Sequence, residues 1–410
     1  MDLRPGDLFA GLRGERADGG EFAPAALQAG AWGVLVGPEH AERAAAAGGG
    51  AVIEVERPLE ALGALARAWR GELGCRVIGV TGSTGKTSTK DILAALLAPA
   101  LRTHANRENL NTEIGLPLSI LEAEPGTEAM VLEMAMRGEG QIAELVAIAE
   151  PDVGVIVNVG PVHLELLGTV ERVAAAKAEL IRDLRPGAAC VVPAGEPLLD
   201  VHLRADLETI SFGPGGQVTL AGFDPSGGGG RAVIAARGEM LELELSYAEP
   251  HNLLNTLAAV GAALAAGVRP QGHVEPRFSS LRGEVVELAG GVTVVNDCYN
   301  ANPMSMRAAL KHLAETPAER RLAVLGTMAE LGEGSADFHR EIGEEASALG
   351  IDVLVTVGEL ALPYAETFGG ELHQVGSPEE AGAVLEEIAA PGDRVLVKGS
   401  RSVGLERVLA

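Results

Sequence analysis

The sequence TGSTGKTS at positions 81–88 constrains the fold of this chain more than any other feature. It follows an apolar run at 77–80 and leads into a segment at 91–97 whose apolar residues have helical spacing. A strand that turns through glycines into a helix N-terminus directs backbone N–H groups and the helix dipole at an anion. Lys86 adds a positive charge, and the hydroxyl of Thr87 is a suitable ligand for Mg²⁺. The run therefore predicts a loop that binds nucleotide phosphates. The residues assigned to this loop are Gly82, Ser83, Thr84, Gly85, Lys86, Thr87 and Ser88.

This loop is a shortened variant of the general phosphate-loop pattern. The usual G-x-x-x-x-G-K-[ST] spacing requires glycine at position 80, where this chain has Val80, and the first loop glycine is Gly82. The pattern indicates that the chain binds ATP or GTP, and it does not indicate which reaction uses the nucleotide. The sequence has no Asn-Lys-x-Asp tetrad of the kind that reads guanine, which disfavours a GTPase.

Composition narrows the class of protein. A length of 410 residues predicts two to three domains, and the contents of 47% hydrophobic and 22% charged residues are typical of a globular protein. The sequence contains neither an apolar run long enough to span a membrane nor a signal region, so we predict a cytoplasmic location. Three separated cysteines indicate neither a disulfide framework nor a zinc cluster. A net charge of −25 argues against a nucleic-acid surface.

The pattern along the chain divides it into three units. Residues 1–73 form a small α/β unit with strands at 33–36 and 51–55, a helix from 58 to about 70 and a linker at 71–74. Residues 74–273 alternate strands and helices, followed by a short antiparallel region and a further helix. The strands expected there are 76–81, 129–134, 153–159 and 188–192, the helices 86–98, 139–149, 169–185 and 251–266, and the antiparallel region 207–247.

Residues 274–410 repeat the alternation of strands and helices. The strands expected are 284–288, 292–297, 321–326, 352–357 and 393–398, and the helices 303–315, 335–349, 377–389 and 401–409. Strands separated by helices of this length predict parallel sheets covered on both faces. The sequence therefore predicts an α/β protein with a central phosphate-loop domain, a doubly wound C-terminal domain and a ligand site between them.

Two side chains follow strands at the edge where the phosphate loop lies. Glu133 ends the apolar strand at 129–134, and a carboxylate there is well placed for Mg²⁺, although a solvated strand end is an equal alternative. His163 follows the next strand and is a candidate metal ligand, although a lone loop histidine is usually surface decoration.

Lys177 and two asparagines are further candidates. Only five of the 32 basic residues are lysine, and Lys177 lies in an alanine-rich helix. An uncharged lysine amine can take up CO₂ as a carbamate that supplies oxygen ligands to a metal, which a guanidinium cannot do. The alternative is an exposed surface lysine. Asn252 and Asn255 are about one helical turn apart, so both amides share a face and could contact a base, although Asn252 could also cap the helix.

Several longer motifs make the chain resemble the Mur ligases of peptidoglycan synthesis. They are the phosphate loop, the sequence NLNTEIGLPL at 109–118, the sequence DCYNANP at 297–303, Glu330-Leu331-Gly332 with His339, and KGSR at 398–401. The resemblance runs from about Arg4 to the C-terminus. The family usually has a further segment before the sequence RPGDLF at 4–9, so the N-terminal domain is expected to be shortened.

The resemblance implies a three-domain Mur ligase architecture. Residues 1–73 would hold the uridine end of a substrate, 74–273 would bind ATP, and 274–410 would carry the incoming amine. It implies an ATP-dependent ligase, acting as a monomer, that joins D-alanyl-D-alanine to UDP-N-acetylmuramoyl-tripeptide through an acyl phosphate. Two alternatives remain open, another amino-acid ligase of the same superfamily and a phosphate-loop regulatory NTPase.

The resemblance also implies roles for individual residues. Lys86, His163 and Lys177 would be catalytic, with Thr87 and Glu133 on one Mg²⁺ and His163 and a carbamylated Lys177 on a second. The additional nucleotide-binding residues implied are Asn252, Asn255, Arg282 and Asp297, and the substrate-binding residues implied are Asn111, Thr112, Glu113, Tyr299, Asn300, Asn302, Lys398 and Arg401.

Overall fold

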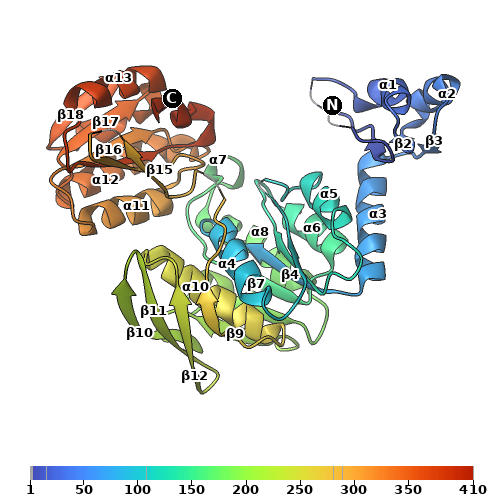
Figure 1. Cartoon of the computed structure of the whole chain (residues 1–410), viewed down its shortest axis with the longest axis horizontal. Helices are drawn as coiled ribbons and strands as arrows, with labels where there is room; N and C mark the ends of the chain where they lie inside the picture. The colour runs from blue at the N-terminus through green and yellow to red at the C-terminus, as the bar shows by residue number, and fades with distance from the viewer. Residues whose placement is uncertain (1–2, 15, 108, 280, 289, 410) are drawn as a thin grey trace.

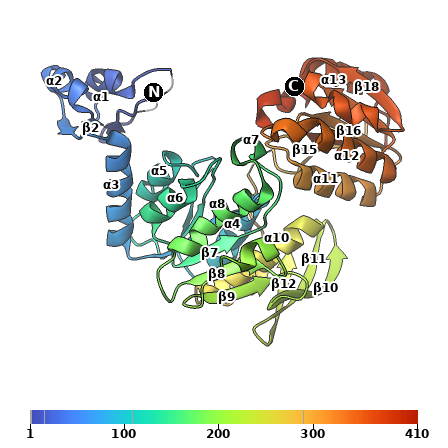
Figure 2. The same cartoon turned by 180° about the vertical axis from the view of Figure 1, so that it is seen from behind.

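The computed structural model describes residues 3–14, 16–107, 109–279, 281–288 and 290–409. The chain forms three β-sheets in succession, each with its own helices (Figure 1). The first and third sheets lie at opposite ends of the molecule, and the second lies between them (Figure 1, Figure 2). The predicted α/β class is confirmed, and all three sheets have mostly parallel strands.

The N-terminal sheet has three parallel strands. They are β1 (Leu8–Ala10), β2 (Gly33–Val36) and β3 (Ala51–Glu54). The strands are connected through η1 (Gly19–Phe22), α1 (Ala23–Gln28) and α2 (Pro38–Ala47). Both α-helices have proline in the first turn, where its missing N–H leaves no intrahelical bond unmade. Leu27 and Val34 anchor a small core of mostly alanine side chains between the helices and the sheet.

Helix α3 (Pro58–Leu73) leads from the N-terminal sheet to the central part of the molecule (Figure 1). The prediction that this helix ends near Arg70 and gives way to a linker at 71–74 is wrong. Trp69 and Leu73 pack against the core of the central part, which offsets the cost of about 1 kcal/mol for a glycine inside a helix. Gly74 ends the helix in the left-handed region at φ 58°, and its N–H donates to the carbonyl of Arg70.

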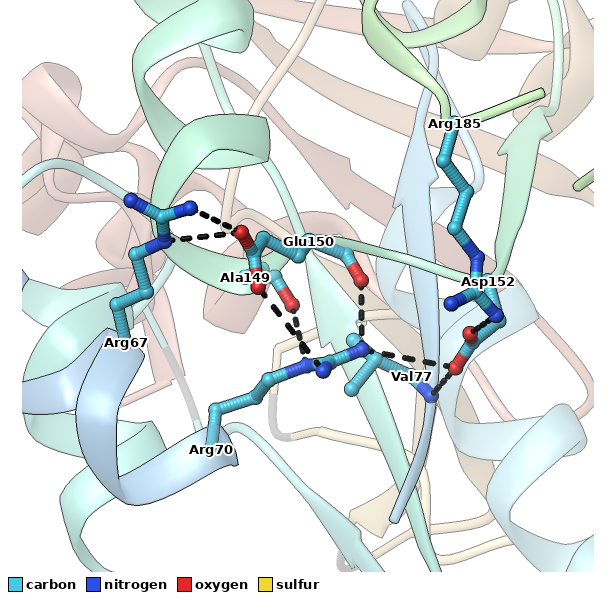
Figure 3. Close-up of polar contacts among 7 residues, drawn as sticks. All are labelled: Arg67, Arg70, Val77, Ala149, Glu150, Asp152 and Arg185. Carbon is cyan, nitrogen blue, oxygen red and sulfur yellow. Dashed lines mark hydrogen bonds and ion pairs between the residues drawn. The ribbon is translucent and has the colours of Figure 1, made fainter. Parts of the chain in front are cut away.

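Arg70 binds the end of α3 to the last turn of α6 (Gln141–Ala149), as Figure 3 shows. Its Nε donates to the carbonyl oxygen of Ala149 at 3.1 Å, and Nη2 donates to that of Glu150 at 2.8 Å. Nη2 also lies 3.8 Å from a carboxylate oxygen of Asp152. One side chain thus satisfies carbonyls that a helix end leaves without intrahelical partners.

Replacing Arg70 by alanine is expected to lower the free energy of unfolding by about 1–3 kcal/mol, because buried carbonyls lose their donor. The matched control is Arg67→Ala. Arg67 pairs with Glu150, but its side chain is 60% exposed against 15% for Arg70, so the expected loss is about 0.5 kcal/mol or less. Urea unfolding followed by tryptophan fluorescence, to which Trp69 on α3 contributes, measures both. Equal losses in the two variants would contradict the assignment.

The central sheet has ten strands in the order β13-β12-β11-β10-β9-β8-β7-β4-β6-β5. The strands are β4 (Arg76–Thr81), β5 (Thr103–Ala105), β6 (Ala129–Glu133), β7 (Val153–Ile156), β8 (Ala189–Pro193), β9 (Glu208–Phe212), β10 (Val218–Ser226), β11 (Gly229–Ala236), β12 (Glu239–Leu245) and β13 (Gly272–Val274). The strands from β5 to β9 are parallel to one another. The antiparallel region predicted at 207–247 is found in β10 to β12, whereas β9 is parallel to β8.

Helices cover both faces of the central sheet. On one face α4 (Lys86–Leu97) and α10 (Pro250–Ala265) share a core with the strands. On the other face α3, α5 (Gly115–Leu121), α6 and α8 (Val170–Asp183) form a second core. Two short helices, α7 (Leu164–Leu167) and α9 (Pro197–Asp200), complete this part. Burial on both faces explains why β4, β6 and β7 are apolar without alternation. β5 and α5 were not predicted, because both are short.

The C-terminal sheet has the order β14-β15-β19-β16-β17-β18, with only β14 antiparallel to its neighbour. The strands are β14 (Glu284–Leu288), β15 (Val292–Asp297), β16 (Arg321–Gly326), β17 (Val353–Val357), β18 (Glu371–Val375) and β19 (Arg394–Lys398). The helices are α11 (Pro303–Glu315), η2 (Gly332–Gly334), α12 (Ser335–Ala348), η3 (Glu359–Glu366) and α13 (Pro378–Ile388). The predicted doubly wound arrangement is confirmed.

The helix predicted at 401–409 is wrong. The chain forms two short 3₁₀ segments there, η4 (Arg401–Val403) and η5 (Leu405–Leu409). Gly404 separates them at φ 72°, in the left-handed region, which interrupts a continuous helix.

The cysteines and the lengths of the helices bear on whether the chain has disulfides or membrane spans. Cys75, Cys190 and Cys298 form no disulfide, and their burial was not predicted. Within the described ranges, no helix is both long enough and apolar enough to cross a membrane.

The order of the central strands predicts a ligand-binding edge at the end of β4. The chain continues from β4 to β5 and β6 on one side and then crosses to β7 on the other. Loops that leave the carboxyl ends of parallel strands diverge at such a crossing, and ligands bind there. The phosphate loop, Glu133 and the segment before His163 all follow the ends of these strands.

Candidate active site

The predicted phosphate loop connects β4 to α4. Gly85 precedes the helix in the left-handed region at φ 73°. A Cβ atom at Gly85 would lie 2.6 Å from Oδ1 of Asn255 on α10, so both the backbone conformation and the neighbouring helix require glycine. The loop is therefore closely packed against α10, and the first N–H groups of α4 remain available to an anion.

The residues after β7 hold the loop in place. Asn158 accepts a hydrogen bond from the Thr84 N–H at 2.8 Å, and its Nδ2 donates to Thr84 Oγ1 at 2.9 Å. Ser83 Oγ donates to the carbonyl of Gly160 at 3.2 Å and accepts from its N–H at 2.9 Å. A loop fixed at both Ser83 and Thr84 is preorganised to bind phosphate.

Lys86 reaches back over the loop it terminates. Its Nζ donates to the carbonyl oxygen of Gly82 at 2.9 Å. Burial lowers the pKa of Lys86, with Glu133 opposing the shift and Arg282 reinforcing it. Lys86 thus lies close enough for its pKa to be affected by the Glu133 carboxylate of the central part and the Arg282 guanidinium of the C-terminal part.

Glu133 has the surroundings expected of a magnesium ligand. Its side chain is buried, and its carboxylate accepts hydrogen bonds from Thr87 Oγ1 at 2.6 Å and Asn111 Nδ2 at 2.9 Å. None of the ion pairs found among the described residues includes Glu133. A buried carboxylate held by neutral donors, with a threonine hydroxyl beside it, fits a divalent cation that prefers oxygen ligands.

Lys177 on α8 is buried and chemically unusual. Its side chain is 2% exposed, and within the described part of the chain it makes no hydrogen bond or ion pair. Burial places the pKa of Lys177 well below its usual range, and the charge of Lys86 lowers it further. The alternative of an exposed surface lysine is therefore wrong. Burial thus disfavours the charged form of this amine.

His163 makes its side-chain contact with the C-terminal part and not with Glu133 or Lys177. It precedes α7 with a left-handed backbone at φ 54°, and its Nδ1 is bound to Oε2 of Glu330 in the C-terminal part. Among the described residues no hydrogen bond or ion pair joins His163 to Glu133 or Lys177. The structure thus brings Lys86, Thr87, Glu133 and Lys177 together and engages His163 elsewhere.

The two asparagines of α10 lie beside the phosphate loop. Asn252 and Asn255 are both buried, and Nδ2 of Asn255 donates to Oδ1 of Asn252 at 3.3 Å. Asn252 Nδ2 also donates to Glu249 at 3.3 Å, and Glu249, not Asn252, precedes the first residue of the helix. The two amides therefore share one face of α10, as the helical spacing predicts, and Asn255 lies against the loop at Gly85.

Arg282 of the C-terminal part lies near enough to the phosphate loop for its charge to lower the pKa of Lys86. The guanidinium of Arg282 lies over the ring of Tyr299, 4.1 Å from its centre, and its buried Nε has no hydrogen-bond partner. Asp297 pairs with Lys398 at 2.5 Å, and Lys398 also donates to the carbonyl of Asn300 at 3.1 Å. An unpartnered guanidinium N–H beside the phosphate loop leaves a donor for an anionic ligand.

The remaining predicted substrate-binding residues are placed as follows. Asn302 caps α11 by accepting from the Ser305 N–H at 3.0 Å. Arg401 is largely exposed and pairs with Glu406 at 3.3 Å. The carbonyl of Thr112 accepts a hydrogen bond at the start of α5, and Glu113 is half-buried in the same loop. Asn302 and Lys398 thus already have partners in this structure.

Three family models together match most of the chain. The model of the Mur ligase family catalytic domain matches residues 1–70, the Mur ligase middle domain 80–263, and the Mur ligase glutamate ligase domain 281–401. A protein of Synechocystis sp. named UDP-N-acetylmuramoyl-tripeptide--D-alanyl-D-alanine ligase is 36% identical, covering 100% of this chain and 89% of that protein. This chain belongs to the Mur ligase family. It is accordingly an ATP-dependent ligase.

Other Mur ligases give the same match over the whole length. A Bacillus subtilis protein of the same name is 35% identical over 99% of this chain and 90% of its own. The crystal structure of MurF ligase from Thermotoga maritima in complex with ADP has 34% identity and a TM-score of 0.84, covering 100% of this chain and 94% of that one. A crystal structure of MurF from Acinetobacter baumannii has a TM-score of 0.89 at 27% identity, covering 90% of that chain. The predicted Mur ligase architecture is confirmed.

Two residues of this Mur ligase site were not predicted. Asn158 binds the phosphate loop, and Asn106 accepts the Glu133 N–H at 2.8 Å and donates to its carbonyl at 3.1 Å. Asn106 directly follows β5, and Asn158 is the second residue after β7. An amide within two residues of the end of a parallel strand, at the ligand-binding edge, is the signal that could have identified them.

Proposed function

We propose that this enzyme joins D-alanyl-D-alanine to UDP-N-acetylmuramoyl-tripeptide with the hydrolysis of ATP. The observation that carries the proposal is that relatives bearing that activity in their names match the chain from end to end at 35–36% identity. The buried group of Lys86, Thr87, Glu133 and Lys177 supports it, because acyl activation requires a nucleotide phosphate and a carboxylate to meet.

In the first step the carboxylate of the tripeptide attacks the γ-phosphate of ATP and forms an acyl phosphate, with ADP leaving. Phosphoryl transfer needs mainly positioning and charge neutralisation. In this proposal the N–H groups at the start of α4 and the Lys86 amine bind the phosphates, and Asn252 and Asn255 contact the adenine. The position of Asn255 against the loop supports it. Magnesium, held by Thr87 and Glu133, would neutralise the charge between the two anions when bound.

We further propose that Lys177 acts as a carbamate. CO₂ adds to the neutral amine, a proton is released, and the side chain becomes an anion with two oxygen atoms. Such an anion, together with His163, is a ligand set for a second divalent cation. The burial of Lys177 and its lack of a partner among the described residues support the proposal.

In the second step the amine of D-alanyl-D-alanine attacks the acyl phosphate carbon, and inorganic phosphate leaves as the amide forms. Arg282 and Asp297 belong to the C-terminal part, so closure of that part over the nucleotide would shield the acyl phosphate from water. The roles of Tyr299, Asn300 and the other predicted amine-side residues remain predictions.

The nucleotide-sugar end of the substrate needs a separate place. An open cavity of about 1030 Å³ is lined by Arg4 and Asp7 of the N-terminal part and by residues of β5 and the loop before β6. Its lining holds as many carboxylates as arginines, and Arg4 and Arg102 are the donors that a phosphate group would use there. We propose this cavity for the diphosphate, and Asn111, Thr112 and Glu113 for the sugar and peptide side.

The proposed functional division is 1–73, 74–273 and 274–410. It is supported by one sheet in each part, and β13 lies across the second boundary. A cytoplasmic location and a monomeric state are part of the same proposal. The location accords with an activity on a UDP-linked precursor, and the monomeric state is proposed because the three parts of one chain supply every residue assigned to the site.

The activity is tested with purified enzyme, ATP, Mg²⁺, UDP-N-acetylmuramoyl-tripeptide and a panel of amines. We expect ADP and a product of the mass of tripeptide plus D-alanyl-D-alanine. A product formed only with a single amino acid would indicate another ligase of the superfamily. ATP hydrolysis that responds to neither acceptor nor amine would instead favour a regulatory NTPase and overturn the proposal.

A further inference from the structure

Two residues with an uncommon backbone conformation meet where the central and C-terminal parts touch. His163 and Glu330 both have positive φ, 54° and 62°, which few non-glycine residues adopt. His163 Nδ1 binds Glu330 Oε2, and the backbone N–H of Glu165 donates to the Glu330 carbonyl at 3.2 Å. Strain of this kind persists only where the surroundings fix it, and it gathers at functional sites.

The contact is closely fitted on both sides. Gly332 lies against the start of α7, where a Cβ atom would be 3.3 Å from Cα of Glu165. A Cβ atom at Gly160 would be 1.9 Å from Sδ of Met304 in the C-terminal part. Figures 1 and 2 both show α7 beside the C-terminal part. Glu330 therefore contacts His163 across a closely packed interface between the central and C-terminal parts.

The bond to Glu330 determines what the imidazole can do. A carboxylate at Nδ1 fixes the proton on that nitrogen and leaves the Nε2 lone pair free for a cation. The second oxygen of Glu330 lies 3.4 Å from Nε of Arg137, which is 73% exposed. Glu330 is thus held from two sides, and His163 is held by Glu330.

We propose that Glu330 is a positioning residue that orients His163 toward a divalent cation. Because Glu330 belongs to the C-terminal part, the seating of that part on α7 and the completion of the cation site are coupled. The inference rests on the proposed function, in which His163 is a ligand of the second metal. It goes beyond that function by assigning a role to Glu330.

The inference is tested by titrating Mn²⁺ into the enzyme with a non-hydrolysable ATP analogue, followed by electron paramagnetic resonance. Glu330→Ala is expected to weaken one class of Mn²⁺ site by about 10- to 100-fold, the usual effect of removing such a partner. Glu330→Gln retains an acceptor for Nδ1–H and should lose less. Glu333→Ala, an exposed carboxylate in the same loop, is the matched control and should not change binding.

A second readout follows the imidazole itself. Nitrogen-15 NMR of His163, assigned with His163→Gln, is expected to show the Nδ1–H tautomer in wild type and in Glu330→Gln, and a mixture in Glu330→Ala. Mn²⁺ affinity and tautomer unchanged in a folded Glu330→Ala variant would overturn the inference. That outcome leaves amide formation by the wild type intact, so it is distinguishable from failure of the proposed function.

Discussion

Replacing Lys177 by alanine is expected to lower the rate of amide formation by about 10³-fold or more. A catalytic metal supplies several kcal/mol of charge stabilisation, and each 1.36 kcal/mol is tenfold in rate. The variant cannot form the carbamate that would hold the second cation. Short carboxylic acids such as formate or acetate should restore part of the rate, because they supply two oxygen atoms in the space that the side chain vacates.

The matched control is Lys311→Ala. Lys311 lies on α11 with a side chain 64% exposed, so its loss should leave the rate unchanged. Carbon-13 NMR of wild type in labelled bicarbonate should show a carbamate resonance that Lys177→Ala lacks. Wild-type activity in Lys177→Ala, or the absence of that resonance in an active enzyme, would remove the carbamate from the mechanism.

The sequence predicts those parts of this site that depend on local pattern. The phosphate loop, Glu133 and the paired asparagines of α10 lie in segments whose strand or helix is apparent from the apolar residues around them. A glycine between a buried strand and a helix has few structural alternatives. The order of the parallel strands then brings these segments to one edge without further information.

The contacts between distant segments could not be predicted in the same way. Glu330 and His163 are 167 positions apart, and nothing in either local pattern indicates the other. The pairing of Asp297 with Lys398 depends on β19, which lies between β15 and β16 although it comes last among these strands in the chain. The first contact depends on how two domains pack together and the second on the order of strands in one sheet, and the periodicity of the sequence records neither.

Short or irregular elements were the other source of error. Gly71 suggested a linker by composition, but Trp69 and Leu73 on either side pack into the central core and extend α3 past it. At the C-terminus the apolar spacing of 401–409 is compatible with a helix, and the conformation of Gly404 divides it. Gly71 thus lies inside a helix, whereas Gly404 interrupts one. Which of the two outcomes a glycine has depends on the tertiary packing around it.

Replacing Lys86 by methionine is the second large effect that we expect. The substitution retains the length of the side chain and removes its charge, so the affinity for ADP should fall and the rate of amide formation should drop by about 10²- to 10³-fold. Isothermal titration with ADP and a coupled assay of ADP release measure the two changes. Lys311→Met is the control, because Lys311 is exposed and distant from the loop.

The melting temperature of Lys86→Met tests whether Lys86 serves the nucleotide or the loop. Burial and the charge of Lys86 both lower the pKa of Lys177, and burial lowers the pKa of Lys86 itself. A charged Lys86 is therefore unfavourable in the enzyme without nucleotide, and removing it should leave the melting temperature unchanged or raise it. A catalytic group that costs stability until phosphate arrives would behave in this way. A Lys86→Met variant that unfolds at lower temperature while it still binds ADP would show that the lysine supports the loop and not the nucleotide.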